Sequence, residues 1–160
     1  KQSYDMGIFP SKNAVKETHE LVILQLSRSQ FAINQTPIRL NEAQYKKVDS
    51  SSISQNLALF SSNRHQISVM GWGYFHNENA EETMHYIKFK SADHQYIFPA
   101  NLELRPDVAK VFQNGVNLQQ SGFNLSLNNP KLESGVYDVY LLLKNKQMIS
   151  EIYLNKKIEI

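Results

Sequence analysis

The chain has 160 residues, 41% hydrophobic and 20% charged, which is enough for one domain with a buried core and too few for two large ones. Seventeen basic against fifteen acidic residues leave a net charge of +2, so the charge predicts no phosphate-binding stripe and no nucleic-acid partner. Cysteine is absent, which excludes disulfides, thiolate zinc sites and cysteine nucleophiles. No apolar run is long enough to span a membrane, and we expect no membrane contact from this segment itself.

Two parts are expected along the chain. Residues 1–52 are predicted to be an N-terminal extension that packs on a main domain formed by residues 53–160. The boundary lies at the serine-rich, linker-like residues 49–54. The chain begins with Lys1 and shows no signal-peptide pattern, so we expect a mature or trimmed piece of a longer protein.

Short strands are the main predicted element. In the extension, residues 41–45 suit one helical turn with Asn41 as its cap. In the main domain, most of the strand segments alternate apolar and polar residues with a period of two. The segments predicted as strands are residues 21–26, 30–33, 67–75, 85–90, 95–98, 123–128, 136–143 and 148–154.

One short helix is predicted at residues 105–112. Proline at position 106 suits a first helical turn, the acid after it suits the helix dipole, and Gly115 supplies a stop. The side chains expected to share its buried face are those of Val108, Val111 and Phe112. Short strands separated by turn signals favour a mainly β fold, a β-sandwich, over an α/β sheet.

Four short motifs carry a resemblance to a known family. They are GWGYF at residues 71–75, RPDVA at 105–109, SGF at 121–123 and GVY at 135–137. In this order and spacing they resemble an immunoglobulin-like β-sandwich module of bacterial cell-envelope proteins, over residues 53–153. From the residues alone, all four also have architectural explanations: the glycines beside Trp72, for example, permit a bulge or the close approach of another backbone.

The resemblance implies a location and a role. Such modules sit outside the cytoplasm, often as appendages of membrane proteins that make or modify surface polysaccharides. No catalytic residues are known in the module, so the resemblance transfers none to this chain. It implies an extracytoplasmic domain, at the cell surface or secreted.

Motifs for catalysis or metal binding are not found. The five histidines lack zinc-ligand spacing, and the oxygen-rich loop at residues 77–82 lacks the spaced aspartates of a calcium site. No serine lies in a G-x-S-x-G or S-x-x-K motif, and no phosphate-binding glycine loop can be assembled. We therefore expect no metal, no cofactor and no enzymatic activity. A small β-fold hydrolase with a site built from loops remains an alternative.

The candidate ligand-binding residues are aromatic. Trp72 and Tyr74 share one face of their predicted strand, and Tyr86 or Tyr96 could lie nearby. One interpretation is that the N-terminal residues cover this face and the rings belong to the core. The other is that they form an exposed aromatic platform on which a sugar could stack.

These observations predict a non-catalytic accessory or binding domain. Its expected partner is a cell-envelope glycan, or another envelope protein. The first alternative is a structural or protein–protein interaction domain without affinity for sugars. The exposure of Trp72 is expected to separate the two interpretations.

Overall fold

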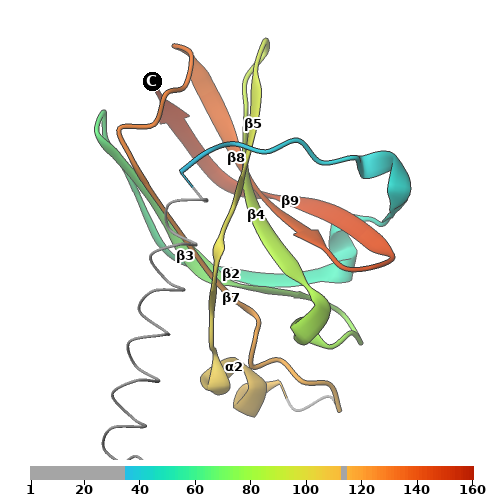
Figure 1. Ribbon diagram of the computed structural model, residues 1–160. Coiled ribbons are helices and arrows are strands. Elements are labelled where there is room, and N and C mark those ends of the chain that lie inside the picture. Colours follow the sequence, from blue (N-terminus) through green and yellow to red (C-terminus); the bar gives the residue numbers. More distant parts are fainter. Residues whose placement is uncertain (1–34, 113–114) are drawn as a thin grey trace, which may run out of the picture.

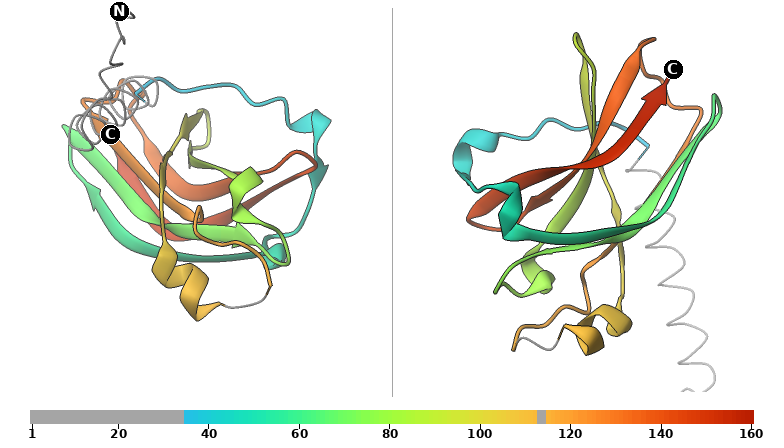
Figure 2. Two further views of the ribbon diagram at one scale, coloured as in Figure 1. Left: turned by 60° about the horizontal axis from the view of Figure 1, so that its bottom comes forward. Right: turned by 180° about the vertical axis from the view of Figure 1, so that it is seen from behind.

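The computed structural model describes residues 35–112 and 115–160, and in them two β-sheets pack face to face (Figures 1 and 2). The sheets have the strand orders β1-β9-β8-β4-β5 and β2-β3-β7-β6. The strands are β1 (Lys46–Lys47), β2 (Ile53–Ser62), β3 (Gln66–Phe75), β4 (Met84–Lys90), β5 (Gln95–Pro99), β6 (Asn101–Glu103), β7 (Gly122–Asn128), β8 (Val136–Lys144) and β9 (Met148–Glu159). The helical elements are α2 (Pro106–Val111) and the 3₁₀ turns η1 (Glu42–Gln44), η2 (Ser50–Ser52) and η3 (Ala80–Glu82). The predicted mainly β sandwich with one short helix is confirmed, whereas the strands predicted at 21–26 and 30–33 lie outside the described residues.

The core lies between the sheets and is filled by the inward rows of the alternating strands. Burial of each large apolar side chain there contributes roughly 1.5–3 kcal/mol. The buried side chains of this cluster include Ile67, Val69, Phe75, Ile87, Phe89, Phe98, Phe123, Leu125, Leu127, Tyr137, Val139, Leu141 and Leu143. Period-two alternation predicted these rows because successive side chains of a strand point to opposite faces.

Strand β2 is a finding that the sequence patterns missed. It pairs antiparallel with β3 along its whole length, and its register shifts between Leu57 and Leu59. The bulge breaks the alternation, and half of the strand's residues are exposed because β2 is an edge strand. Opposite the bulge, a side chain at Gly71 would collide with the carbonyl oxygen of Asn56, which is the close backbone approach expected beside Trp72.

The extension crosses the outer face of the five-stranded sheet. The amide of Ile38 donates to the carbonyl of Ile97 in β5 at 2.8 Å, and β1 pairs in parallel with β9 near the opposite edge. Figure 1 shows this segment in blue and cyan as it passes from β5 to β9. The serine-rich segment is an ordered 3₁₀ turn, in which the Asp49 carboxylate accepts from the amide of Ser51 at 2.9 Å.

Helix α2 lies on the outer face of the other sheet, and Figure 2 shows it beyond that layer. Arg105 donates twice to the Asp107 carboxylate, at 2.7 and 2.9 Å, and this pair fastens the helix start. Val108 is buried, but Val111 is 73% exposed, so the predicted three-residue buried face is wrong at Val111. The helix ends there, and Phe112 leaves the helical path to contact the sheet in its place.

Candidate binding face

Trp72 and Tyr74 lie on the outer face of the four-stranded sheet. Their rings stack at a centroid distance of 5.8 Å, and Phe112 lies 5.4 Å from Trp72 and 6.0 Å from Tyr74. Tyr74 is only 4% exposed, whereas Trp72 is half-buried. The cover comes from α2 and from Leu118 in the loop after it. Residues 38–45 of the N-terminal extension pack on the other sheet, and the expected cover by residues 1–34 lies outside the described residues.

Tyr86 and Tyr96 lie elsewhere. Tyr86 faces outward from β4 and is 3% exposed in a cluster with Ile97 and Leu142, under residues 38–45. Tyr96 points to the core side of β5, with its ring 5.9 Å from that of Tyr137. Because β3 and β4 belong to different sheets, their outward side chains face opposite directions. The four predicted residues therefore do not form one aromatic platform.

A different aromatic pair lies on the open part of the five-stranded sheet. Tyr140 of β8 and Tyr153 of β9 are cross-strand neighbours, with ring centroids 5.4 Å apart, and both are partly exposed. Burial raises the pKa of Tyr140, and the carboxylates of Asp138 and Glu151 raise it further. The Tyr140 phenol therefore keeps its proton at neutral pH and can donate a hydrogen bond.

An ion pair formed by a buried lysine and a partly exposed glutamate lies beside these tyrosines. Lys88 of β4 is 5% exposed, its Nζ lies 2.5 Å from Oε2 of Glu151, and the ammonium sits 5.7 Å from the Tyr140 ring centroid. A desolvated ammonium is costly unless it is paired. The Glu151 carboxylate and the ring supply that compensation and hold the lysine flat across β8.

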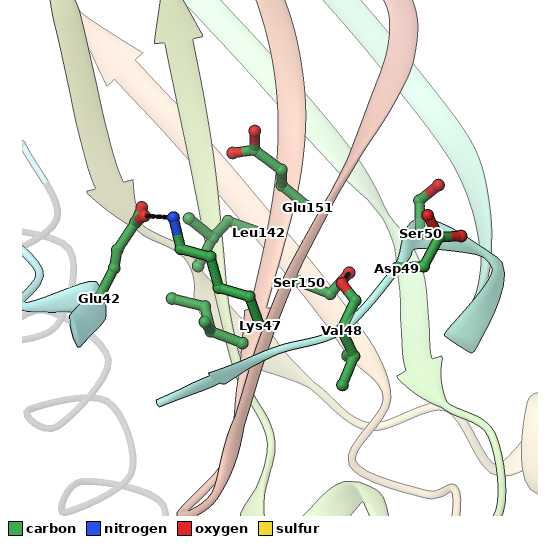
Figure 3. A pocket seen from close by; sticks show the side chains of 9 residues that line it. Glu42, Lys47, Val48, Asp49, Ser50, Leu142, Ser150 and Glu151 are labelled. Atoms are coloured by element: carbon green, nitrogen blue, oxygen red, sulfur yellow. Dashed lines mark hydrogen bonds and ion pairs between the residues drawn. The ribbon is translucent and has the colours of Figure 1, made fainter. Parts of the chain in front are cut away.

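Two depressions flank the ion pair, and both include Glu42. The first has a volume of about 290 Å³ and is shown in Figure 3, where Lys47 reaches across to Glu42 at 3.1 Å. The second has a volume of about 410 Å³. Both are comparable in size to small-ligand sites. The first is lined by Glu42, Lys47, Val48, Asp49, Ser50, Leu142, Ile149, Ser150 and Glu151, and the second by Ile38, Arg39, Leu40, Glu42, Lys88, Gln95 and Ile97.

A third depression, of about 560 Å³, lies at the end of the same sheet, where β8 turns into β9. It is lined in part by Tyr45 and Lys144, whose Nζ donates to the tyrosine hydroxyl at 3.1 Å and lies 4.9 Å from its ring centroid. That hydrogen bond raises the pKa of Lys144. Here the lysine is already satisfied by the extension, so it serves to hold residues 38–45 in place.

The described residues give little support for a metal site or a catalytic site. In the described ranges, no group of three or more His, Cys, Asp or Glu side chains could hold a metal ion. Ser54 Oγ and His76 Nε2 lie 2.7 Å apart, but both sit on the surface where β2 begins and β3 ends, and neither lines any of the three depressions. None of the helices in residues 35–112 and 115–160 is long and apolar enough to cross a membrane.

The sequence contained a partial signal for this face. Alternation places Tyr86, Lys88 and Lys90 in one outward row and Glu151 and Tyr153 in another. The sequence did not show that β8 and β9 pair with Tyr140 opposite Tyr153, or that residues 38–45 cover one half of the face and leave the other open.

Comparisons with known proteins do not assign the chain to a family. No protein-family model, no curated protein and no solved structure matches the chain.

Proposed function

We propose that this chain is a non-catalytic, extracytoplasmic binding domain of a bacterial cell-envelope protein, and that it holds a surface polysaccharide on the outer face of its five-stranded sheet. The observation that carries the proposal is the Tyr140–Tyr153 pair, two partly exposed rings on an open sheet face. Aromatic rings combine a large apolar surface with a polar edge, which suits the apolar face and the hydroxyl groups of a sugar. The neighbouring charged depressions offer hydrogen-bonding groups.

The strand order supports an immunoglobulin-like type for the sandwich. If β2 to β9 are labelled A, B, C, C′, D, E, F and G, the sheets are A-B-E-D and G-F-C-C′, as in immunoglobulin-like domains. The hydroxyl of Tyr137, at the start of β8, donates to the carbonyl of Glu133 at 2.7 Å, an arrangement like the tyrosine corner of those domains. The extracytoplasmic, envelope-associated part of the proposal follows from the motif resemblance.

Binding of envelope polysaccharide fragments, measured by calorimetry on the wild type and three variants, tests the proposal. We expect Tyr140→Ala and Tyr153→Ala each to weaken binding roughly tenfold, since removing one stacked ring costs about 1–3 kcal/mol when the ligand is a nucleotide base and a sugar should behave similarly. Phe112→Ala removes a partly exposed aromatic side chain at the end of α2, over the outer face of the opposite sheet, and is the matched control. Equal affinities in all four proteins would remove this face as the binding site.

Two alternative functions, an interaction domain and a hydrolase, predict different results. A protein that binds no polysaccharide, but retains a protein partner through the Tyr140 face, would be an interaction domain. The hydrolase alternative has one observation in its favour, the Ser54–His76 pair. Hydrolysis of esters or glycans by the wild type, abolished in Ser54→Ala, would establish it.

A further inference from the structure

The second depression carries uncompensated positive charge. Arg39 is exposed, lines the depression and makes no ion pair among residues 35–112 and 115–160. The one acid in its lining, Glu42, is engaged by Lys47 at 3.1 Å. The buried Lys88 at its side is neutralised by Glu151 and adds no surplus charge. Among the described residues, no carboxylate is within ion-pair distance of the Arg39 guanidinium.

A second exposed cation, Lys90, makes no ion pair among residues 35–112 and 115–160. Lys90 is exposed, two residues beyond Lys88 on the same face of β4, and is registered opposite Gln95, which lines the depression. Its other cross-strand neighbour, Asp138, is taken by Lys157 at 2.8 Å. Lys90 therefore also lacks an acidic partner within the described part of the chain.

Three ion pairs on this face are each neutral, and neither Arg39 nor Lys90 takes part in them. The pairs are Lys47–Glu42, Lys88–Glu151 and Lys157–Asp138. Arg39 and Lys90 lie on the outer face of β4 and β5. Lys88 connects the cations with the tyrosines, because it lines the second depression together with Arg39 and its ammonium lies 5.7 Å from the Tyr140 ring centroid.

We propose that the glycan held by this face is acidic and bears ring carboxylates, as in a uronic-acid-containing polysaccharide. This inference rests on the proposed function. The sugar ring lies on Tyr140 and Tyr153, and its carboxylate is bound by Arg39 and Lys90. A guanidinium presents parallel N–H groups that match the two oxygens of a carboxylate. A uronate fits the face because it carries its charge directly on the stacked ring, whereas a polyol phosphate has no ring to stack.

The test compares oligogalacturonate with its methyl ester, which has the same backbone without the charge. We expect the acid form to bind wild-type protein at least about tenfold more tightly at low salt, and the difference to shrink as salt screens the exposed cations. Arg39→Ala and Lys90→Ala should each remove about three- to tenfold of the affinity for the acid form and leave that for the ester unchanged. Arg64→Ala and Lys110→Ala remove one exposed cation each away from this face and should change neither affinity.

The outcomes separate this inference from the proposed function. If the acid and the ester bound equally well and both lost affinity in Tyr140→Ala, the preference for an acidic glycan would be overturned. The glycan-binding face would stand. Binding of neither probe, nor of envelope polysaccharide fragments, would overturn both. If Arg64→Ala and Lys110→Ala weakened binding as much as the two site variants, the attraction would be general and the inference would fail. Equally tight binding of a polyglycerol phosphate, lost in Arg39→Ala, would overturn the requirement for a ring carboxylate.

Discussion

The outer faces of the two sheets differ in what passes over them. On the four-stranded sheet, α2 and the loop after it cover Tyr74 and leave Trp72 half-buried. On the five-stranded sheet, residues 38–45 cover Tyr86 but stop short of Tyr140 and Tyr153. Each face carries outward-pointing aromatic residues. Whether such a residue is buried or open to solvent is therefore decided by the course of a distant connection.

The largest expected effect contrasts a covered tyrosine with an open one. Tyr74→Ala should lower the free energy of unfolding by about 3–5 kcal/mol, since it leaves a cavity beneath α2. Tyr153→Ala should lower it by less than about 1 kcal/mol, because the side chain is partly solvated. Urea unfolding followed by Trp72 fluorescence measures both. Similar losses in the two variants would show that the faces are not differently covered.

A second prediction concerns the residue that joins the two layers. His85 is buried between the sheets, and its Nε2 donates to the carbonyl of Gly73, in the strand that carries Trp72 and Tyr74, at 2.7 Å. Burial lowers the pKa of His85 from 6.5 to about 4. The folded state therefore favours the neutral ring, and the resulting stability is complete above pH 6.5 and lost as the pH falls towards 4.

This loss should reach roughly 3 kcal/mol between pH 6.5 and 4, at 1.36 kcal/mol per pKa unit. Unfolding curves of the wild type across this window measure it. His85→Gln keeps a hydrogen-bond donor without a titrating group and should remove this part of the pH dependence. An unchanged slope in that variant would assign the pH dependence to other groups.

A third prediction tests the ion pair that lies on the open face. Glu151→Ala should destabilise the fold by about 1–2 kcal/mol, because it leaves the Lys88 ammonium desolvated and unpaired; the value is below that of a fully buried pair since Glu151 is 40% exposed. Lys88→Met keeps the apolar stem without the charge and should cost less. If Lys88→Met proved less stable than Glu151→Ala, desolvation of the unpaired ammonium would not explain the loss of stability.

The smallest expected effect concerns the edge between the two faces. Strand β6 covers only the first part of β7, and beyond it the side-chain amide of Gln35 accepts from the amide of Asn128 at 2.9 Å and donates to the carbonyl of Ser126 at 2.6 Å. Gln35→Ala should cost about 1 kcal/mol, the usual net contribution of such hydrogen bonds. Thr36→Ala, at the next, exposed position, is the control. Equal stability of both variants would show that the amide does not protect the edge.

Elements with a clear local sequence pattern were predicted, and those without one were missed. Strands β3, β4, β7 and β8 were predicted because one of their faces is packed against the other sheet and reads as a period-two row. Strand β2 was missed because a bulge and an exposed edge erase that row. Strand β9 was predicted only to Leu154, whereas it continues past Asn155, where the backbone has a positive φ of 55° and local alternation is interrupted.

The sequence by itself determined the fold class, the inward rows of the core and the short helix, because these depend on side-chain periodicity and turn residues within a few positions of each other. It also identified aromatic residues as the candidates for binding. Only the tertiary structure decided which of them are open, since α2 covers Tyr74, residues 38–45 cover Tyr86, and pairing of β8 with β9 places Tyr140 beside Tyr153. Burial of an outward row depends on contacts between segments far apart in the chain, and no local pattern records which segment provides them.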